Sequence, residues 1–450
     1  MTFNGWQKTS IPIYTQFYVF NVTNPDQIRD KQHKPILEEL GPYTFRVWTE
    51  KVNVSWDHNN GTVQYKQIRS WSFVSEKTNG SLDDQVVHLN VPMISAGNEL
   101  VRRHASSQFK FDALNVIIDD SESPLFKRNT IRELLFDGYD EILLRAARDI
   151  FPQTPFTRFG FFYGRNNTST DGTYRIFTGE KGINRLGLLD TWNHRKTNSK
   201  WFGKRCQRYD GVSGGDFQPP YRNPRPKTID VFMGDFCRPF TLEFAEEVDC
   251  RGVKCSRYWA SPTLFDYSLP ENRCYCESNR CPANGVLNVS VCTMGSPTAI
   301  SFPHFLYADN NYLQSVDGLT PRPVDHSFYM DFEDHLGVPL NVAARLQVNI
   351  VVEKNQNLDF SRNFSDKPLY FPQFWFSTTA AVGDDMIQQL NFLVNLVPYY
   401  INIISFLFLL IGFLTLISAA FYTYRCKKTI HINNRQKYKA VEMNSTHFST

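Results

Sequence analysis

Cysteine thiols carry the most distinctive chemistry in this sequence, because they form disulfides or bind zinc according to their spacing and compartment. Eight of the nine cysteines lie between Cys206 and Cys292, and the ninth is Cys426. Cys274 and Cys276 could suggest a zinc site, but no paired histidines stand at finger spacing. An even number of cysteines in one stretch therefore favours a disulfide framework, in agreement with the oxidising compartment indicated below.

Spacing alone settles only part of the disulfide pairing. Cys250 with Cys255, and Cys276 with Cys281, are close enough in sequence to close tight local loops. In an extended segment, residues 274 and 276 point to opposite faces, so they can serve different partners. Spacing leaves the pairing open among Cys206, Cys237, Cys274 and Cys292.

A serine motif could indicate nucleophilic catalysis. Residues 211–215 read Gly-Val-Ser-Gly-Gly, which satisfies the Gly-x-Ser-x-Gly pattern of a nucleophile elbow. That elbow requires a strand before the serine and a helix after it, whereas two prolines follow here. The acidic cluster of Asp119, Asp120 and Glu122 fits a solvated tip better than an acid-base pair. We therefore expect neither an enzyme nor a bound cofactor or metal.

Asparagine sequons indicate that most of the chain meets the glycosylation machinery. Eight Asn-x-Ser/Thr sites precede the apolar segment near the C-terminus, many of them in expected turns. Their number favours a lumenal or secreted chain over chance, and we expect Asn444 in the tail to stay unmodified. The candidate glycosylation sites are Asn21, Asn53, Asn60, Asn79, Asn166, Asn167, Asn288 and Asn363.

An uncharged stretch near the C-terminus predicts a transmembrane helix. Residues 401–424 contain no charged side chain and exceed the roughly 20 apolar residues that cross a bilayer. Tyrosines flank both ends, as in an aromatic belt, and six basic residues follow, which places the C-terminus in the cytosol. We expect a lumenal or extracellular ectodomain over 1–396, a membrane helix over 397–424 and a cytosolic tail over 425–450.

The expected tail carries two short signals. Cys426 stands beside the bilayer, where palmitoylation is common. Tyr438 and Val441 fit the Tyr-x-x-apolar pattern that endocytic adaptors read. We carry both as candidate sites.

The N-terminus does not read as a signal peptide. The chain begins MTFNGWQKTS, with no charged region followed by an apolar stretch. We therefore expect that the true N-terminus is missing from this chain.

Composition narrows the class of protein. Hydrophobic residues make up 42% of 450 residues, which is typical of a folded chain. With 48 basic and 45 acidic residues, the net charge of +3 gives no footprint for nucleic acid. The mean hydropathy of −0.38 means that any membrane segment is local.

The elements that must position these residues follow from periodicity. Aromatic and β-branched residues alternate over 13–22, 43–56 and 61–74, with turn residues between the segments. Further strand patterns occur at 159–165, 172–179, 286–292 and 342–354. Helical spacing over 96–118 and 129–149 predicts a helical pair. No long polar linker divides the chain, so we expect one α+β ectodomain.

Several sequence blocks, taken in order, resemble the class B scavenger receptor family. The resemblance runs from about Phe3 to the juxtamembrane cysteine, and its most specific parts are PHFLYAD and the Cys-x-Cys cluster. The blocks are FNGWQKTSIPIYTQFYVFNVTNP, LGPYTFRV, TIRELLFDGYDEIL, FCRPF, CYCESNRC, ISFPHFLYAD and ARLQVNIVV.

The resemblance implies a fold and a disulfide pattern. It implies a single antiparallel β-barrel-like ectodomain with a membrane-distal helical bundle at about 96–149, and an apolar tunnel that carries lipid toward the bilayer. Family members are anchored at both ends, which agrees with a missing N-terminal helix. Within the disulfide-rich region 206–292, the implied pairs are Cys206–Cys274, Cys237–Cys292 and Cys276–Cys281, with Cys250–Cys255 as an additional pair.

The expected apex departs from some family members in charge. Where those members carry lysines that attract anionic lipid, this chain has Asp120 and Glu122. Such a reversal weakens the attraction of anionic partners, including oxidised low-density lipoprotein. The nearby basic residues have two interpretations: they form a displaced basic patch, or they lie on ordinary solvated helix faces. These residues are Arg102, Arg103, Lys110, Lys127 and Arg128.

Two functions follow as hypotheses from the resemblance. The first is a receptor of the plasma membrane, cycling to endosomes or lysosomes, that takes up lipid through the tunnel or by endocytosis. Its expected ligands are lipoprotein particles, cholesterol or its esters, fatty acids and phospholipids. The alternative is an endosomal, lysosomal or phagocytic receptor that binds a protein or apoptotic-cell ligand at the apex.

Overall fold

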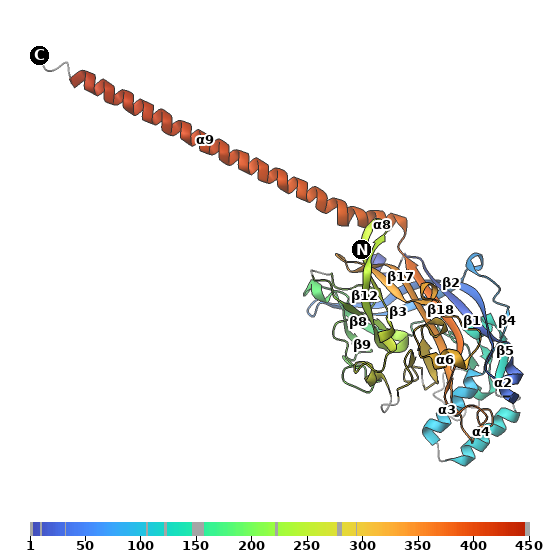
Figure 1. Cartoon of the computed structure of the whole chain (residues 1–450). Helices are drawn as coiled ribbons and strands as arrows, with labels where there is room; N and C mark the ends of the chain where they lie inside the picture. The colour runs from blue at the N-terminus through green and yellow to red at the C-terminus, as the bar shows by residue number, and fades with distance from the viewer. Residues whose placement is uncertain are drawn as a thin grey trace. The chain divides into compact units, whose positions relative to one another are not determined.

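A computed structural model describes most of the chain as two units (Figure 1). Unit 1 spans Met1–Gly383 and unit 2 spans Asp384–Thr450. The residues described are 3–9, 11–31, 33–104, 107–120, 124–145, 157–220, 224–276, 281–293 and 295–445.

Unit 1 is built on a large, nearly closed β-barrel-like sheet. Neighbouring strands run in the order β10-β11-β12-β13-β16-β17-β18-β1-β2-β3-β8-β9, and β14 and β15 branch from β17. All pairs in this sheet are antiparallel except β10 with β11. The strands are β1 Ile13–Val22, β2 Leu37–Asp57, β3 Thr62–Phe73, β8 Thr173–Phe177, β9 Leu189–Trp192, β10 Val212–Ser213, β11 Thr228–Met233, β12 Arg238–Cys250, β13 Val253–Trp259, β14 Val286–Asn288, β15 Thr298–Ser301, β16 Tyr329–Glu333, β17 Val338–Val352 and β18 Leu369–Ala381.

The two ends of the strand order meet at a short seam. Leu188, beside β9, forms an antiparallel bridge with Ser213 of β10. The Gly214 N–H also donates to the Gly187 carbonyl at 2.9 Å. Main-chain pairing therefore joins the first and last strands and satisfies part of two sheet edges.

Side-chain alternation gives the strands two apolar faces. In β1, Phe17 and Val19 belong to one core cluster, whereas Phe20 and Val22 belong to another. Successive side chains of a strand point to opposite faces, so both faces of this central strand are covered. The predicted strand over 13–22 coincides with β1.

Short helices and two small sheets surround the barrel. The helices α3 and α4 pack against each other, and their inner faces join the cluster that holds Phe20 and Val22. The small sheets are the pairs β4-β5 and β6-β7. The elements are α1 Phe3–Gln7, α2 Pro25–Lys31, η1 Ser75–Lys77, β4 Gln85–Leu89, α3 Val91–His104, α4 Gln108–Asp120, β5 Phe126–Thr130, η2 Glu133–Asp137, β6 Tyr139–Asp140, β7 Arg158–Phe159, η3 Ile183–Arg185, η4 Gly234–Phe236, η5 Pro262–Phe265, η6 Arg273–Tyr275, η8 Pro303–Phe305, α6 Asn310–Ser315 and α7 Pro323–His326.

The second predicted helix, over 129–149, is interrupted in the described residues. Residues up to Thr130 pair with β4, residues 131–137 form a helical turn that ends in the π-helical η2, and residues 142–145 are helical again. Gly138 has a φ of +69°, which ends that turn, and Tyr139–Asp140 is extended. The apolar spacing corresponds to two helical segments separated at residues 138–141, and residues 146–149 lie outside the described part.

Two other predicted elements are divided or shorter in the structure. The segment 96–118, predicted as one helical stretch, forms parts of α3 and α4. The predicted strand over 159–165 retains only the end of β7, because turns begin at Phe161.

Unit 2 is helical. It comprises α8 Asp384–Asn391, η9 Phe392–Leu396 and α9 Val397–Ser445. Within the described residues, Asp384–Lys439 is the one helical segment whose length and composition suit a membrane span, and its most apolar window is unburied. This matches the apolar stretch found in the sequence.

Candidate functional site

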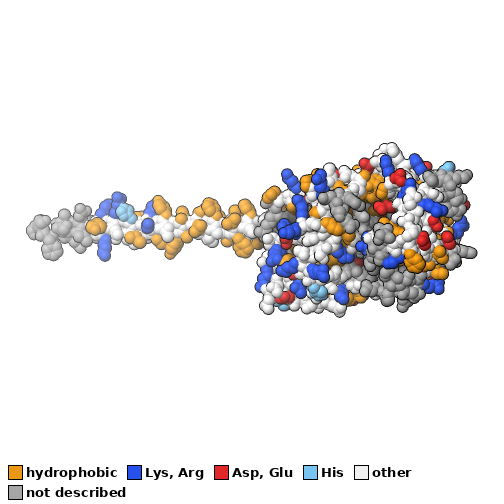
Figure 2. Space-filling view, turned by 90° about the horizontal axis from the view of Figure 1, so that it is seen from below, with side chains coloured by type: hydrophobic (Ala, Val, Ile, Leu, Met, Phe, Trp, Pro, Cys, Tyr) orange, Lys and Arg blue, Asp and Glu red, His pale blue; other side chains and the backbone are white. Residues whose placement is uncertain are grey.

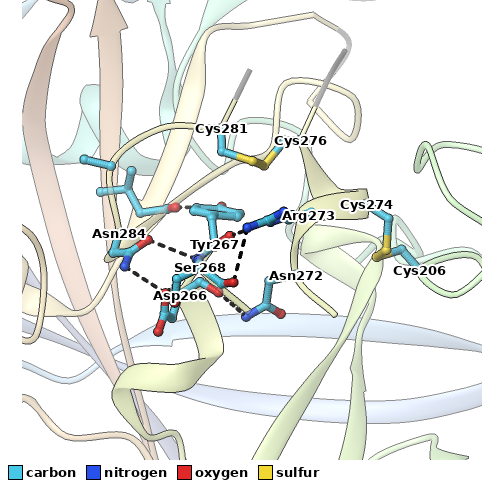
Figure 3. The surroundings of a disulfide bond; sticks show 12 residues. Cys206, Asp266, Tyr267, Ser268, Asn272, Arg273, Cys274, Cys276, Cys281 and Asn284 are labelled. Atoms are coloured by element: carbon cyan, nitrogen blue, oxygen red, sulfur yellow. Dashed lines mark hydrogen bonds between the residues drawn. A yellow bond between two sulfur atoms is a disulfide. The ribbon is translucent and has the colours of Figure 1, made fainter. Parts of the chain in front are cut away.

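Two disulfides lie near a hydrogen-bonded loop of unit 1 (Figure 3). Cys206–Cys274 and Cys276–Cys281 have Cα–Cα distances of 5.9 and 5.0 Å. In this loop, the Asn284 amide donates to Asp266 at 2.8 Å (Figure 3). The neighbouring Cys274 and Cys276 are thus bonded to different partners, although Cys274 lies in the 3-10 helix η6 rather than in an extended segment.

Two further disulfides stabilise distant parts of the barrel. Cys237–Cys292 joins residues 55 positions apart, and Cys250–Cys255 closes the hairpin between β12 and β13. Cys426 is the free cysteine of the described residues and is partly exposed on α9. All eight cysteines of the 206–292 region are therefore oxidised in the structure.

The serine of the Gly-x-Ser-x-Gly pattern lies at the barrel seam. Ser213 is fully buried, and its hydroxyl donates to the Phe217 carbonyl at 2.6 Å. The Gly215 N–H donates to the same hydroxyl at 3.0 Å. The motif closes a turn, which explains its glycines without any nucleophile.

Most sequon asparagines are accessible. All candidate sites except Asn21 are exposed. Asn21 is half-buried in β1, where its amide oxygen accepts from the Val87 N–H and its nitrogen donates to Glu38. Asn166 also uses both amide atoms, on the main chain of Trp71. At these two sites, the glycan would be attached to an amide nitrogen that already donates a hydrogen bond.

Helix α4 has an unusual outer face. Phe111, Leu114 and Ile118 are buried, which fixes the helix on unit 1. On the other side, Phe109 is 81% exposed and Val116 is 56% exposed. Residues seven apart share a helix face, so these two form an apolar patch in water.

The basic residues near α4 are partly neutralised. Arg102 forms an ion pair with Glu99 at 2.8 Å, and Lys127 pairs with the buried Glu141. Lys110 and Arg128 are exposed. The candidate contacts Arg103, Asp120 and Glu122 have side chains outside the described residues, so the structure does not bring the whole expected patch together.

An aromatic cluster covers one face of β1, β2, β3 and β18. Phe17 lies at its centre, with ring centroids at 5.1 Å from Phe162, 6.0 Å from Trp71 and 6.2 Å from Phe136. Although Phe17 is fully buried, these three rings keep partial exposure. The remaining rings of this aromatic cluster are Phe45, Phe73, Phe161, Phe374 and Phe376.

A polar cluster occupies the opposite face of the same strands. The carboxylate of Glu39 accepts from Trp375 Nε1 at 2.7 Å and from His304 Nε2 at 2.6 Å. His304 Nδ1 accepts the Thr320 N–H at 3.0 Å, so the imidazole proton lies on Nε2 and donates to Glu39. His304 also has a φ of +54°, a conformation that few L residues adopt.

A second histidine completes this polar cluster. The ring of His326 stacks on that of His304 with centroids 4.4 Å apart. His326 Nδ1 accepts the Arg322 N–H at 3.0 Å, and its buried Nε2 has no hydrogen-bond partner. Protonation would remove the acceptor at Nδ1 and bury a charge, which favours the neutral ring.

The pKa values follow from these contacts. Burial lowers the pKa of His326 to about 4, and the neighbouring His304 acts in the same direction. Burial alone would raise the pKa of Glu39, but the hydrogen bonds from His304 and Trp375 outweigh it and lower that pKa. The residues of the polar cluster are far apart in the sequence. Only His304 lies in a block that the sequence singled out, PHFLYAD.

The remaining candidate residues, those of the endocytic signal, lie on unit 2. Tyr438 is 77% exposed on α9, and the side chain of Val441 is outside the described residues. Among the side chains that the structure describes, no group of three or more His, Cys, Asp or Glu is placed to hold a metal ion.

Sequence comparison decides the family. The CD36 family profile matches residues 1–423. The chain belongs to the CD36 family. Protein peste of Drosophila melanogaster is 31% identical over 390 residues, which cover 86% of this chain and 69% of peste. Human lysosome membrane protein 2 is 30% identical over 407 residues, covering 89% of this chain and 82% of that protein. Bovine scavenger receptor class B member 1 is 28% identical over 436 residues, covering 96% and 83%.

Membership of the CD36 family agrees with the other findings. The relatives include class B scavenger receptors and a lysosome membrane protein, so a class B scavenger receptor role is supported for this CD36-family chain. A membrane-spanning helix near the C-terminus fits a membrane protein.

Proposed function

We propose that this CD36-family protein is a membrane receptor that binds lipoprotein particles or free lipid and transfers lipid through its ectodomain. The outer face of α3 and α4 is the proposed ligand surface and forms the membrane-distal helical bundle. Phe109 and Val116 supply the apolar contact there. Cholesterol or its esters, fatty acids and phospholipids are the proposed cargo.

The aromatic cluster around Phe17 is the observation that carries the lipid-transfer step. A lipid leaving a particle must avoid water, because each apolar Å² exposed costs about 25 cal/mol. Partly exposed rings such as Phe136 and Phe162 can cover an acyl chain or sterol at little cost. The proposed apolar tunnel therefore runs along the face of β1, β2, β3 and β18 that holds this cluster.

The proposed topology places the candidate modifications. Residues 1–396 lie outside the cell or in a lumen, with glycans on exposed sequons, and 397–424 cross the membrane. The cytosolic tail 425–450 carries palmitate on Cys426 and is read by endocytic adaptors at Tyr438 and Val441. The receptor works at the plasma membrane and cycles to endosomes or lysosomes.

A protein-ligand receptor of endosomes, lysosomes or phagocytes is the second candidate. It is favoured by the similarity to human lysosome membrane protein 2 and by the rigid apolar patch of Phe109 and Val116. An exposed aromatic on a fixed helix is also a good anchor for a protein partner. Under this proposal the ligand binds, but no lipid passes through the ectodomain.

A larger side chain in the aromatic cluster, where the proposed tunnel runs, distinguishes the two proposed functions. Phe162→Trp enlarges a ring that lies 5.5 Å from both Trp71 and Phe136. Phe244→Trp is the matched control, because Phe244 is also partly exposed but packs in a different core. Cells expressing each variant are given particles labelled separately in cholesteryl ester and in protein.

Lipid transfer predicts that Phe162→Trp lowers cholesteryl-ester uptake severalfold while particle binding is retained and the control stays at wild-type level. Unchanged lipid uptake in Phe162→Trp would refute the proposed passage. Particle or protein binding by the wild type without any lipid uptake would support the protein-ligand receptor instead.

A further inference from the structure

The near-neutral charge of the whole chain conceals a strongly basic segment. Between Asp190 and Asp210 there is no acidic residue, and Asp190 pairs with Arg175 at 3.9 Å. Six lysines and arginines lie in this interval, at Arg195, Lys196, Lys200, Lys204, Arg205 and Arg208. We call residues 193–208 the basic loop.

The charges of the basic loop face solvent and are not neutralised. All six side chains are exposed. None of them forms an ion pair with a carboxylate of the described residues. Arg195 donates to the Ser199 hydroxyl at 3.0 Å and Lys200 to the Val291 carbonyl at 3.2 Å, both of which are neutral groups. Blue side chains also predominate over red ones on the side of unit 1 that carries β8, β9 and β12 (Figure 2).

The basic loop is held in one conformation. Thr197 and Arg208 form an antiparallel bridge across it, and the Cys206–Cys274 disulfide ties its end to η6. Trp201 is 2% exposed and donates from Nε1 to the Cys237 carbonyl at 2.6 Å. A loop fixed in this way loses little conformational entropy when its cations bind a ligand.

The exposed chemistry suits a flexible polyanion better than a membrane surface. Phe202 is the one large apolar side chain of the basic loop that is strongly exposed. A lipid-binding segment needs an extended apolar face beside its cations, which this loop lacks. Instead, exposed Asn193, Thr197 and Ser199 lie among the cations and can bond to hydroxyl groups.

We propose that the basic loop binds a sulfated polysaccharide chain. Arginine guanidinium groups bind sulfate oxygens as a fork, and the lysines add point charges. Clusters of this composition are typical of heparin-binding and nucleic-acid-binding surfaces, and the ectodomain position proposed above removes nucleic acid as the partner. This site is separate from α4 and from the aromatic cluster, so it does not depend on lipid transfer.

Heparin chromatography of the full chain tests the proposal. The protein is held in nanodiscs of neutral phosphatidylcholine, so that no anionic lipid competes. The loop variant carries R195Q, K196Q, K204Q and R205Q. The control carries K34Q, K66Q, K227Q and K367Q, which remove the same charge from exposed lysines elsewhere on unit 1. Two double variants, R195Q with K196Q and K204Q with R205Q, cover the case in which the fourfold variant fails to fold.

The proposal predicts that the loop variant binds heparin at least about tenfold more weakly at 0.15 M salt, while the control is close to wild type. The slope of log affinity against log salt should fall by about one for each contacting cation removed. Desulfated heparin should not bind. Equal losses in the loop variant and the control would overturn the proposal, as would wild-type binding to phosphatidylserine vesicles without binding to heparin.

Discussion

Replacement of His326 by asparagine should remove a specific part of the pH dependence of stability. In the folded protein, burial holds the pKa of His326 at about 4, whereas an unfolded histidine titrates near 6.5. The unfolded state therefore binds a proton first as the pH falls. Stability is greatest above pH 6.5 and declines until the folded ring is protonated near pH 4.

The size of this effect follows from linkage. Between pH 7 and pH 5, the unfolded state gains about 2 kcal/mol of proton-binding free energy that the folded state does not. For a unit of this length, that loss corresponds to a decrease of about 2–3 °C in Tm. Glu39 affects stability in a lower pH range. Because its pKa is lowered in the folded protein, its contribution to the stability is lost only when the pH falls below the ordinary glutamate pKa of 4.5.

Asparagine is chosen because its side-chain oxygen can accept the Arg322 N–H in place of His326 Nδ1. Loss of stacking on His304 lowers Tm at every pH. The difference in Tm between pH 7 and pH 5, however, should be about 2–3 °C smaller than in wild type. The assay is thermal unfolding of the full chain in detergent, followed by intrinsic tryptophan fluorescence. His33→Asn, which removes an exposed imidazole outside the cluster, should keep the wild-type difference. An H326N protein with the full wild-type decrease would refute this reasoning.

Two further predictions concern the ligand surface and the disulfides. Phe109→Ser should weaken particle binding roughly 30-fold in a cell-surface binding assay without lowering Tm, because about 2 kcal/mol of ring burial is available at its 81% exposure; unchanged affinity would exclude this face. Replacing Cys206 and Cys274 together by serine should cost about 4 kcal/mol of unfolding free energy, since the bond spans 68 residues, against about 2 kcal/mol for Cys250 with Cys255, which spans 5. Equal Tm losses in the two double variants would contradict the loop-length argument.

The sequence predicted those elements whose own periodicity was sufficient. The strand over 13–22 is rich in aromatic and β-branched residues that roughly alternate, and its two faces enter two different cores. The pattern over 129–149 did not show that Gly138 bends the chain after the turn that buries Leu134 and Leu135, before the helix resumes at residue 142. Local spacing cannot distinguish a buried turn from the first turn of a long helix.

The candidate sites depended on contacts between distant residues. Glu39 and His304 are 265 residues apart in sequence, so no motif joins them. The aromatic cluster draws on four strands, η2 and the loop after β7, and strand alternation did not indicate which face it would occupy. The net charge of the whole chain gave no sign of the basic loop, and only the structure showed that its cationic side chains are exposed and form no ion pair with the described carboxylates.

The most direct test of lipid transfer is uptake by cells that express the full chain with an N-terminal membrane anchor, beside untransfected cells. The particles carry one label in cholesteryl ester and another in protein. Our account predicts uptake of the ester in excess of the protein. Equal uptake of both labels, or surface display with no ester uptake, would contradict it.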